Sequence, residues 1–153
     1  MRSETNPVEA VVVGAGPAGL GVAIALMDAG VEDLVVLERE TVGASFDSWP
    51  SETRFITPSF PSNSVGMLDL NSIAIGISPA HSMRVEHPTG QEYAKHLRDI
   101  ARYFKVPVLD HVNVNDVTRD GDLFVVETEH GPIWAKHVVW AVGEFQYPRL
   151  MSF

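Results

Sequence analysis

Three glycines near the N-terminus have the spacing of a turn that binds phosphate groups. Gly14 and Gly16 lie between a β-branched run that ends at Val13 and an apolar segment that begins at Pro17, and Gly19 lies near the start of that segment. The first glycine allows a sharp turn, the second lets the backbone approach a pyrophosphate, and the third lets a helix pack against a strand. The start of that helix directs unsatisfied N–H groups and a partial positive charge at phosphates. The spacing therefore predicts a pyrophosphate site.

An acidic residue follows at the distance that such a site needs. Glu38 ends the apolar run 34–37, nineteen residues after the third glycine. Its carboxylate is placed to accept hydrogen bonds from both hydroxyls of an adenosine ribose, and its charge disfavours a ribose with a 2′-phosphate. Glycines, helix and acid together predict the binding of an adenine dinucleotide, FAD or NAD in preference to NADP.

Other kinds of chemical centre have no support in the sequence. The chain has no cysteine, which excludes disulfides, thiolate metal sites and a CxxC redox pair within it. No serine stands in a GxSxG turn, and no pair of carboxylates has a catalytic spacing. No metal site is predicted, because no HxxxH or HExxH pair occurs among the histidines, which are His81, His87, His96, His111, His130 and His137. Catalytic residues stay unassigned, as suits a protein whose cofactor performs the chemistry.

The elements around the glycines are predicted to form a βαβ unit. Residues 9–13 and 34–37 have the continuous apolar character of strands buried on both faces of a parallel sheet. Residues 17–29 form the helix between them, and Gly30 stands where a helix C-cap is expected. Residues 41–88 show no sustained periodicity, so we expect a functional loop with room for short helices.

The second half predicts a helix followed by a three-stranded antiparallel meander. Thr89 and Glu92 form a capping box, and an apolar stripe continues the helix to about Lys105. Strands are predicted at 106–109, 112–118, 123–128, 133–136 and, as a separate buried strand, 137–142; turns are predicted at Asp120-Gly121 and Gly131-Pro132. The fold class is therefore α/β, a parallel sheet with an antiparallel meander.

Length and charge limit the possible partners. The 153 residues fit one domain, 8–153, after a disordered tail at 1–7. A net charge of −9 argues against a nucleic-acid partner. The apolar N-terminal stretch is interrupted by Glu9 and by several glycines, so we expect neither a signal peptide nor a membrane span. A soluble, cytoplasmic protein is the expectation.

Three segments resemble the FAD motifs of flavoproteins that have two dinucleotide-binding domains. This superfamily contains the pyridine nucleotide-disulfide oxidoreductases and the flavin-containing and Baeyer–Villiger monooxygenases. Residues 11–38 are similar to their first FAD motif. Residues 137–143 with Pro148 are similar to the second, hhhATGxxxxP, with Val142 in place of the threonine. Residues 42–46 resemble a GG[ST]W segment that runs along the flavin in the monooxygenase branch. The resemblance implies a Rossmann-like FAD/NAD(P)-binding fold.

The resemblance also implies a role for each matched residue. Residues 14–19 would hold the pyrophosphate, Glu38 the ribose, and the next residue would flank the adenine. The loop after the second strand would approach the ribityl chain or the flavin ring, the start of the meander would offer backbone groups to the adenine, and the second motif would allow close approach to the cofactor. The expected FAD contacts are Gly14, Ala15, Gly16, Pro17, Ala18, Gly19, Glu38, Arg39, Ser45, Phe46, Val114, Ala141 and Gly143. The aromatic and sulfur side chains of the loop, Trp49, Phe55 and Met67, are interpreted as loop packing.

Two functions follow from the resemblance. The first is the FAD-binding part of a flavin-dependent NAD(P)H oxidoreductase, placed in the monooxygenase-like branch because the chain lacks the cysteines of a dithiol centre. The second is a non-catalytic dinucleotide-binding module or one half of a split flavoprotein. The chain carries neither the second glycine motif for NAD(P)H nor the C-terminal flavin segment of the family. We therefore expect a truncated chain whose missing part is a C-terminal domain, a partner chain or a second copy.

Overall fold

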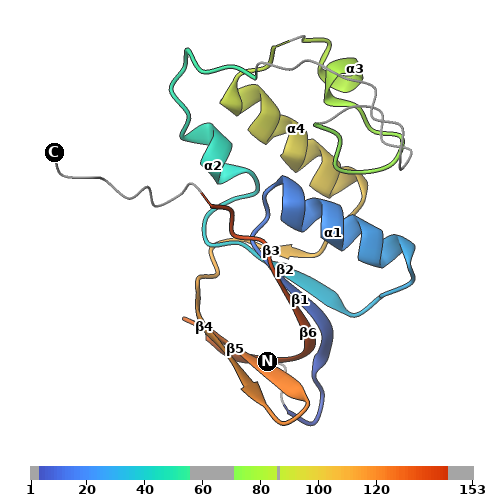
Figure 1. Cartoon of the computed structure of the whole chain (residues 1–153), viewed down its shortest axis with the longest axis vertical. Coiled ribbons are helices and arrows are strands. Elements are labelled where there is room, and N and C mark those ends of the chain that lie inside the picture. The colour runs from blue at the N-terminus through green and yellow to red at the C-terminus, as the bar shows by residue number, and fades with distance from the viewer. Residues whose placement is uncertain (1–3, 56–70, 86, 145–153) are drawn as a thin grey trace, which may run out of the picture.

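The computed structural model describes residues 4–55, 71–85 and 87–144, and it contains one six-stranded sheet with four helices (Figure 1). The strands are β1 (Val8–Val13), β2 (Leu34–Leu37), β3 (Val108–Leu109), β4 (Val114–Asp120), β5 (Leu123–Thr128) and β6 (Gly131–Trp140). The helices are α1 (Pro17–Asp28), α2 (Ala44–Asp47), α3 (Pro79–Met83) and α4 (Gly90–Tyr103). The strand order is β3-β2-β1-β6-β5-β4, with β3, β2, β1 and β6 parallel and β5 antiparallel to both of its neighbours. The predicted α/β fold with a parallel sheet and a meander is confirmed.

The two faces of the parallel strands have different covers. On one face, Val12 and Val36 pack with Leu20 of α1 and Leu97 of α4 in a single apolar cluster. On the other face, a second cluster joins the parallel strands to the meander, and its members include Val11, Val13, Leu37, Val117 and Val126. Figure 1 shows the same arrangement, with the helices on one side of the sheet and the β4–β5 hairpin curled toward the other. This double cover explains the continuous apolar runs of β1 and β2.

Helix α1 ends where the sequence predicts. Gly30 adopts a left-handed φ of 89°, and its N–H donates to the Met27 carbonyl at 3.0 Å. The Val31 N–H donates to the Leu26 carbonyl, also at 3.0 Å. These two bonds form a Schellman motif, in which a glycine is favoured because the backbone is left-handed. The turn that follows returns the chain to the sheet as β2.

Helix α4 begins with the predicted capping box. The Thr89 side chain accepts from the Glu92 N–H at 3.2 Å, and the Thr89 N–H donates to the Glu92 carboxylate at 2.7 Å. The buried stripe contains Tyr93, Leu97 and Ile100, which pack toward α1 and the sheet. The helix ends at Tyr103, two residues before the predicted end at Lys105.

The last strand of the meander is longer than predicted. Residues 133–136 and 137–142 were predicted as separate strands, but residues 131–140 form the single ten-residue strand β6, and Ala141 and Val142 follow it. At Ala135 this strand pairs in parallel with Val8 of β1 and antiparallel with Phe124 of β5. The periodicity changes along β6 because one half borders the meander and the other half borders the buried parallel strands.

The predicted turns are displaced slightly. The Thr128↔Gly131 pair closes the β5–β6 turn, so its tip is at Glu129 and His130 rather than at Gly131-Pro132. The β4–β5 turn lies one residue later than predicted, at residues 121–122. Side-chain hydrogen bonds explain the first shift, because the Thr128 hydroxyl donates to the Gly131 carbonyl at 2.7 Å and stabilises the tight closure.

The long loop contains two short helices, α2 and α3. Residues 1–3 of the predicted tail, together with Met67 and Pro148, lie outside the described residues. Over the part of the chain that the structure describes, no helix has both the length and the apolar character that a membrane span requires.

Candidate dinucleotide-binding site

The predicted site lies at the carboxyl edge of the parallel strands, where the chain changes direction. Strand β1 has β2 on one side and β6 on the other, so the loops that leave β1 and β6 diverge from neighbouring strand ends. Gly14 follows β1, and Ala141 follows β6, where its N–H donates to the Val13 carbonyl at 2.8 Å. In open parallel sheets, ligands bind in the crevice at this point of divergence.

The first and third glycines are required by the packing of the protein itself. Gly14 has a left-handed φ of 101°, and a Cβ there would lie 2.5 Å from the Ala141 carbonyl oxygen. A Cβ on Gly19 would collide with the Gly14 carbonyl oxygen, so the helix could not approach the turn. The two predicted motifs, far apart in the sequence, therefore meet through backbone atoms.

The second glycine differs from the others because it faces open space. A Cβ on Gly16 would meet nothing within 4 Å, and the backbone there is extended. Gly16 is also the N-cap of α1, no side chain caps the helix, and its first turn contains no acidic residue. Ala18 is exposed in that turn. The geometry leaves an uncovered helix N-terminus that suits a phosphate group.

Glu38 borders the same turn. Its carboxylate accepts from the Ala15 N–H at 2.7 Å and from the Glu40 N–H at 2.9 Å, one bond to each oxygen. Its backbone is fixed by the neighbouring strand, since the Glu38 N–H donates to Leu109 and its carbonyl accepts from Val112. Each carboxylate oxygen has a further lone pair, so the group can still accept from ribose hydroxyls.

The loop after β2 reaches the glycine turn through a residue that the sequence did not identify as part of the site. Gly43 has a φ of 76°, and its N–H donates to the Ala15 carbonyl at 3.2 Å. The Ala15 peptide is thus bonded on one side to Glu38 and on the other to Gly43. The sequence indicated this segment through the resemblance of residues 42–46 to a flavin-side motif, but it did not predict the contact of Gly43 with Ala15.

Helix α2 carries two of the predicted cofactor contacts. Ser45 is exposed. The ring of Phe46 packs among aromatic side chains, with its centroid 5.0 Å from that of Tyr93 and 5.9 Å from that of Phe55. Trp49 joins this aromatic cluster 5.1 Å from Phe46, which agrees with the loop-packing interpretation of Trp49 and Phe55. The cofactor contacts of Ser45 and Phe46 stay predictions.

The remaining predicted contacts lie in three separate segments. Arg39 is exposed, with its guanidinium 3.7 Å from the Glu40 carboxylate. Val114 begins β4 and pairs with Thr128. Gly143 has a left-handed φ of 79° and is exposed beyond β6. The adenine and flavin contacts expected of these residues are also predictions.

Comparison with known proteins identifies the family. The family described as pyridine nucleotide-disulphide oxidoreductase matches residues 11–153. The chain belongs to this family.

Relatives within and around this family are longer than the chain. An uncharacterized CzcO-like oxidoreductase of Geobacillus kaustophilus is 27% identical over 146 residues, which are 95% of this chain and 39% of the relative. The FAD-dependent oxidoreductase domain-containing protein 2 of Mus musculus is 26% identical over 93% of this chain and 24% of its own length. The chain therefore spans well under half of these two relatives.

Solved structures share the fold. A bacillithiol disulfide reductase from Bacillus cereus superposes with a TM-score of 0.73 at 25% identity, over 95% of this chain and 43% of that one. A flavin-containing monooxygenase from Stenotrophomonas maltophilia gives 0.68 at 23% identity, over 90% and 38%. Disulfide reductases and monooxygenases thus match almost equally well, so the fold of this part of the family does not separate the two chemistries.

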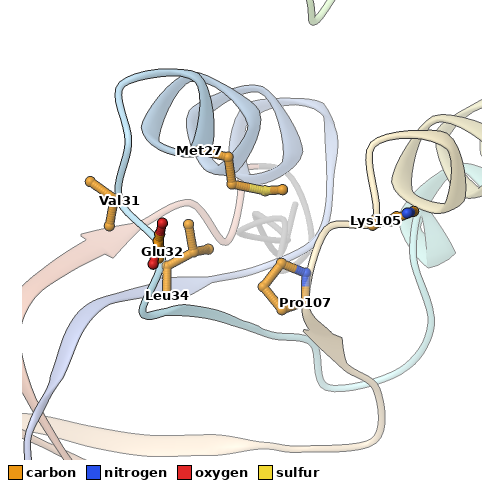
Figure 2. Close-up of a pocket in the computed structure, with 6 residues that line it drawn as sticks. All are labelled: Met27, Val31, Glu32, Leu34, Lys105 and Pro107. Atoms are coloured by element: carbon orange, nitrogen blue, oxygen red, sulfur yellow. The ribbon is translucent and has the colours of Figure 1, made fainter.

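The structure also contains a hollow of about 380 Å³, whose lining residues are drawn in Figure 2. It is bordered by the end of α1, the start of β2 and the segment before β3, through residues that include Met27, Leu34 and Pro107. These positions are at the amino ends of the parallel strands, opposite the glycine turn. Among the described residues, no group of three or more histidines and carboxylates is arranged to hold a metal ion.

Proposed function

We propose that this chain is the FAD-binding unit of a flavin-dependent NAD(P)H oxidoreductase. The observation that carries the proposal is the convergence of the Gly14 turn, the Glu38 carboxylate and the Ala141 segment at one edge of the sheet. Family membership and the flavoenzymes among the structural neighbours support the same cofactor.

The residues at this edge suit an adenine dinucleotide. The uncovered start of α1, with Pro17 and Ala18 in its first turn, would receive the pyrophosphate, and the absence of a Cβ on Gly16 leaves room for it. Glu38 would accept hydrogen bonds from the ribose, while the Ala15 N–H holds that carboxylate in place. Bound FAD would supply hydride acceptance from a reduced nicotinamide and electron delivery to an acceptor.

The branch of the family is a separate part of the proposal. We favour a monooxygenase-like flavoprotein, because residues 42–46 resemble the GG[ST]W segment of that branch. The alternative is a module that binds a dinucleotide without reducing it.

The test measures FAD affinity for wild type and for Glu38→Gln. Glutamine keeps one oxygen for the Ala15 N–H but removes the charge that strengthens bonds from the ribose hydroxyls. We expect about tenfold weaker FAD binding, the loss of one charge-assisted bond. Glu32→Gln is the matched control, since this exposed carboxylate lies before the amino end of β2, away from the glycine turn, and the FAD affinity of that variant should equal that of wild type.

A second measurement separates the two functions. The FAD-loaded chain is mixed with NADH or NADPH without oxygen, and the visible flavin absorption is followed. Bleaching supports an oxidoreductase unit, whereas a loaded chain that never bleaches supports the binding module. A chain that takes up no FAD contradicts the cofactor assignment.

A further inference from the structure

Helix α2 cannot hold its own position. It has only four residues, no side chain caps its N-terminus, and none of its residues is fully buried. A single helical turn is unstable in isolation, so its orientation depends on contacts from elsewhere. Those contacts come from α4.

Arg98 of α4 makes the polar part of this connection. Its Nη1 donates to Asp47 Oδ2 at 2.6 Å, and its Nη2 donates to Asp47 Oδ1 at 3.4 Å. The same Nη1 donates to the Val42 carbonyl at 3.2 Å. One guanidinium therefore holds the last residue of α2 and the backbone just before it, a two-point attachment that suits the planar fork of arginine.

Close packing completes the attachment. A Cβ on Gly43 would lie 3.1 Å from Ala94 Cα and 3.3 Å from Leu97 Cδ1, so this backbone lies directly on α4. A Cβ on Gly90 would collide with the Phe46 carbonyl oxygen. Because Phe46 and Asp47 contact α4 while Ser45 is exposed, the contacts with α4 fix the direction in which Ser45 points.

The attachment continues to the glycine turn. Gly43 lies between Val42, which Arg98 holds, and α2, and its N–H donates to the Ala15 carbonyl. The Ala15 N–H in turn donates to Glu38. The loop held by α4 is therefore bonded directly to the turn proposed to bind the pyrophosphate.

We propose that Arg98 is a positioning residue that holds α2 against α4, so that Ser45 is presented to the flavin-side half of the dinucleotide. This inference rests on the proposed FAD site and adds a residue outside its contact set. If α2 were loosened, it would have to become ordered when FAD binds. The FAD affinity would fall because this ordering costs free energy. The adenosine and pyrophosphate contacts on Gly16 and Glu38 would not change.

The experiment compares two ligands on one variant. ADP contains the adenosine and pyrophosphate half only, whereas FAD also contains the ribityl chain and the flavin. For Arg98→Ala we expect about threefold to tenfold weaker FAD binding, typical of losing a partly exposed charged pair, and ADP affinity within about twofold of wild type. Arg102→Ala is the matched control, since Arg102 lies one turn further on α4 and pairs with Asp99 of the same helix. Its affinities for both ligands should equal those of wild type.

A charge exchange tests the contact directly. Asp47→Arg should weaken FAD binding as Arg98→Asp does, and the Asp47→Arg/Arg98→Asp double variant should recover part of the loss, which a general destabilisation would not give. Equal FAD affinity in Arg98→Ala and wild type, or an equal loss for FAD and ADP, overturns the positioning role alone. A wild-type chain that binds neither ligand overturns the proposed function, and the positioning role with it.

Discussion

At the scale of single residues, two glycines three positions apart have opposite functions. Gly19 is required by the protein, because a Cβ there would collide with the Gly14 carbonyl oxygen. Gly16 has no such neighbour within 4 Å and an extended backbone that any residue can adopt. The motif therefore contains one position constrained by folding and one that the proposed ligand would constrain.

This difference predicts a separation between stability and binding. Gly16→Val should cost no more than about 2 kcal/mol of unfolding free energy, the range for a changed helix N-cap, while it blocks FAD. Gly19→Ala should cost more than about 4 kcal/mol, because backbone atoms would have to separate. Urea unfolding measures the first quantity and FAD titration the second. Full FAD binding by Gly16→Val would contradict the placement of the pyrophosphate.

The sequence identified the residues whose roles follow from local spacing. The glycines and Glu38 follow from the motif, and the structure brings them together at one edge. Arg98 was not identified, because it is 51 residues from Asp47 and neither residue belongs to a motif. A contact of this kind is created by the packing of two helices, which leaves no periodic signal in either segment.

At the scale of elements, α4 is a supporting helix whose start depends on pH. The Thr89 N–H and hydroxyl donate to the Glu92 carboxylate and hold its pKa below the ordinary value near 4.5, with a smaller contribution from Arg54. A carboxyl group with a lowered pKa in the folded state stabilises the fold above its ordinary pKa, and this stabilisation is lost as the pH falls through the lowered value.

The capping box therefore predicts a mutational effect and its pH dependence. Thr89→Ala should lower the unfolding free energy by about 1 kcal/mol at neutral pH, whereas Thr89→Ser, which keeps the hydroxyl, should lose much less. Glu92→Gln should also destabilise at neutral pH, and its difference from wild type should shrink below about pH 4. Denaturant unfolding at several pH values measures both. A difference that grows in acid would contradict the assignment.

The boundaries of helices and strands were predictable where contacts between nearby residues set them. They were not predictable where packing against distant segments sets them. The Schellman glycine marked the end of α1, and the capping box marked the start of α4. Both were predictable because their hydrogen bonds join residues only a few positions apart. Strand β6 was divided in two because its apolar pattern changes at Ala135, where the neighbouring strands change. The helix α2 was not visible, since four residues carry no periodicity and its position depends on α4.

At the scale of the whole molecule, β6 joins the two halves of the sheet. Its first half pairs with β5 of the meander and its second half with β1, beside the glycine turn. The two apolar clusters lie on opposite faces of the same parallel strands. A sheet built in this way has no boundary at which one half could unfold alone, so we expect one cooperative transition.

FAD binding should raise the midpoint temperature of this single unfolding transition for the whole chain. At a free FAD concentration 100 times Kd, the folded state gains about 2.7 kcal/mol, which for a chain of this size raises Tm by about 5–10 °C. Far-UV circular dichroism reports the unfolding of the whole chain. A Trp49→Phe/Trp140→Phe variant leaves Trp134 as the fluorescent probe, and this residue reports unfolding in the half of β6 that pairs with β5. Both signals should move together, and Gly16→Val should show no shift with either probe. Separate transitions for the two probes, or a shift confined to one of them, would contradict a single cooperative unit built around the dinucleotide edge.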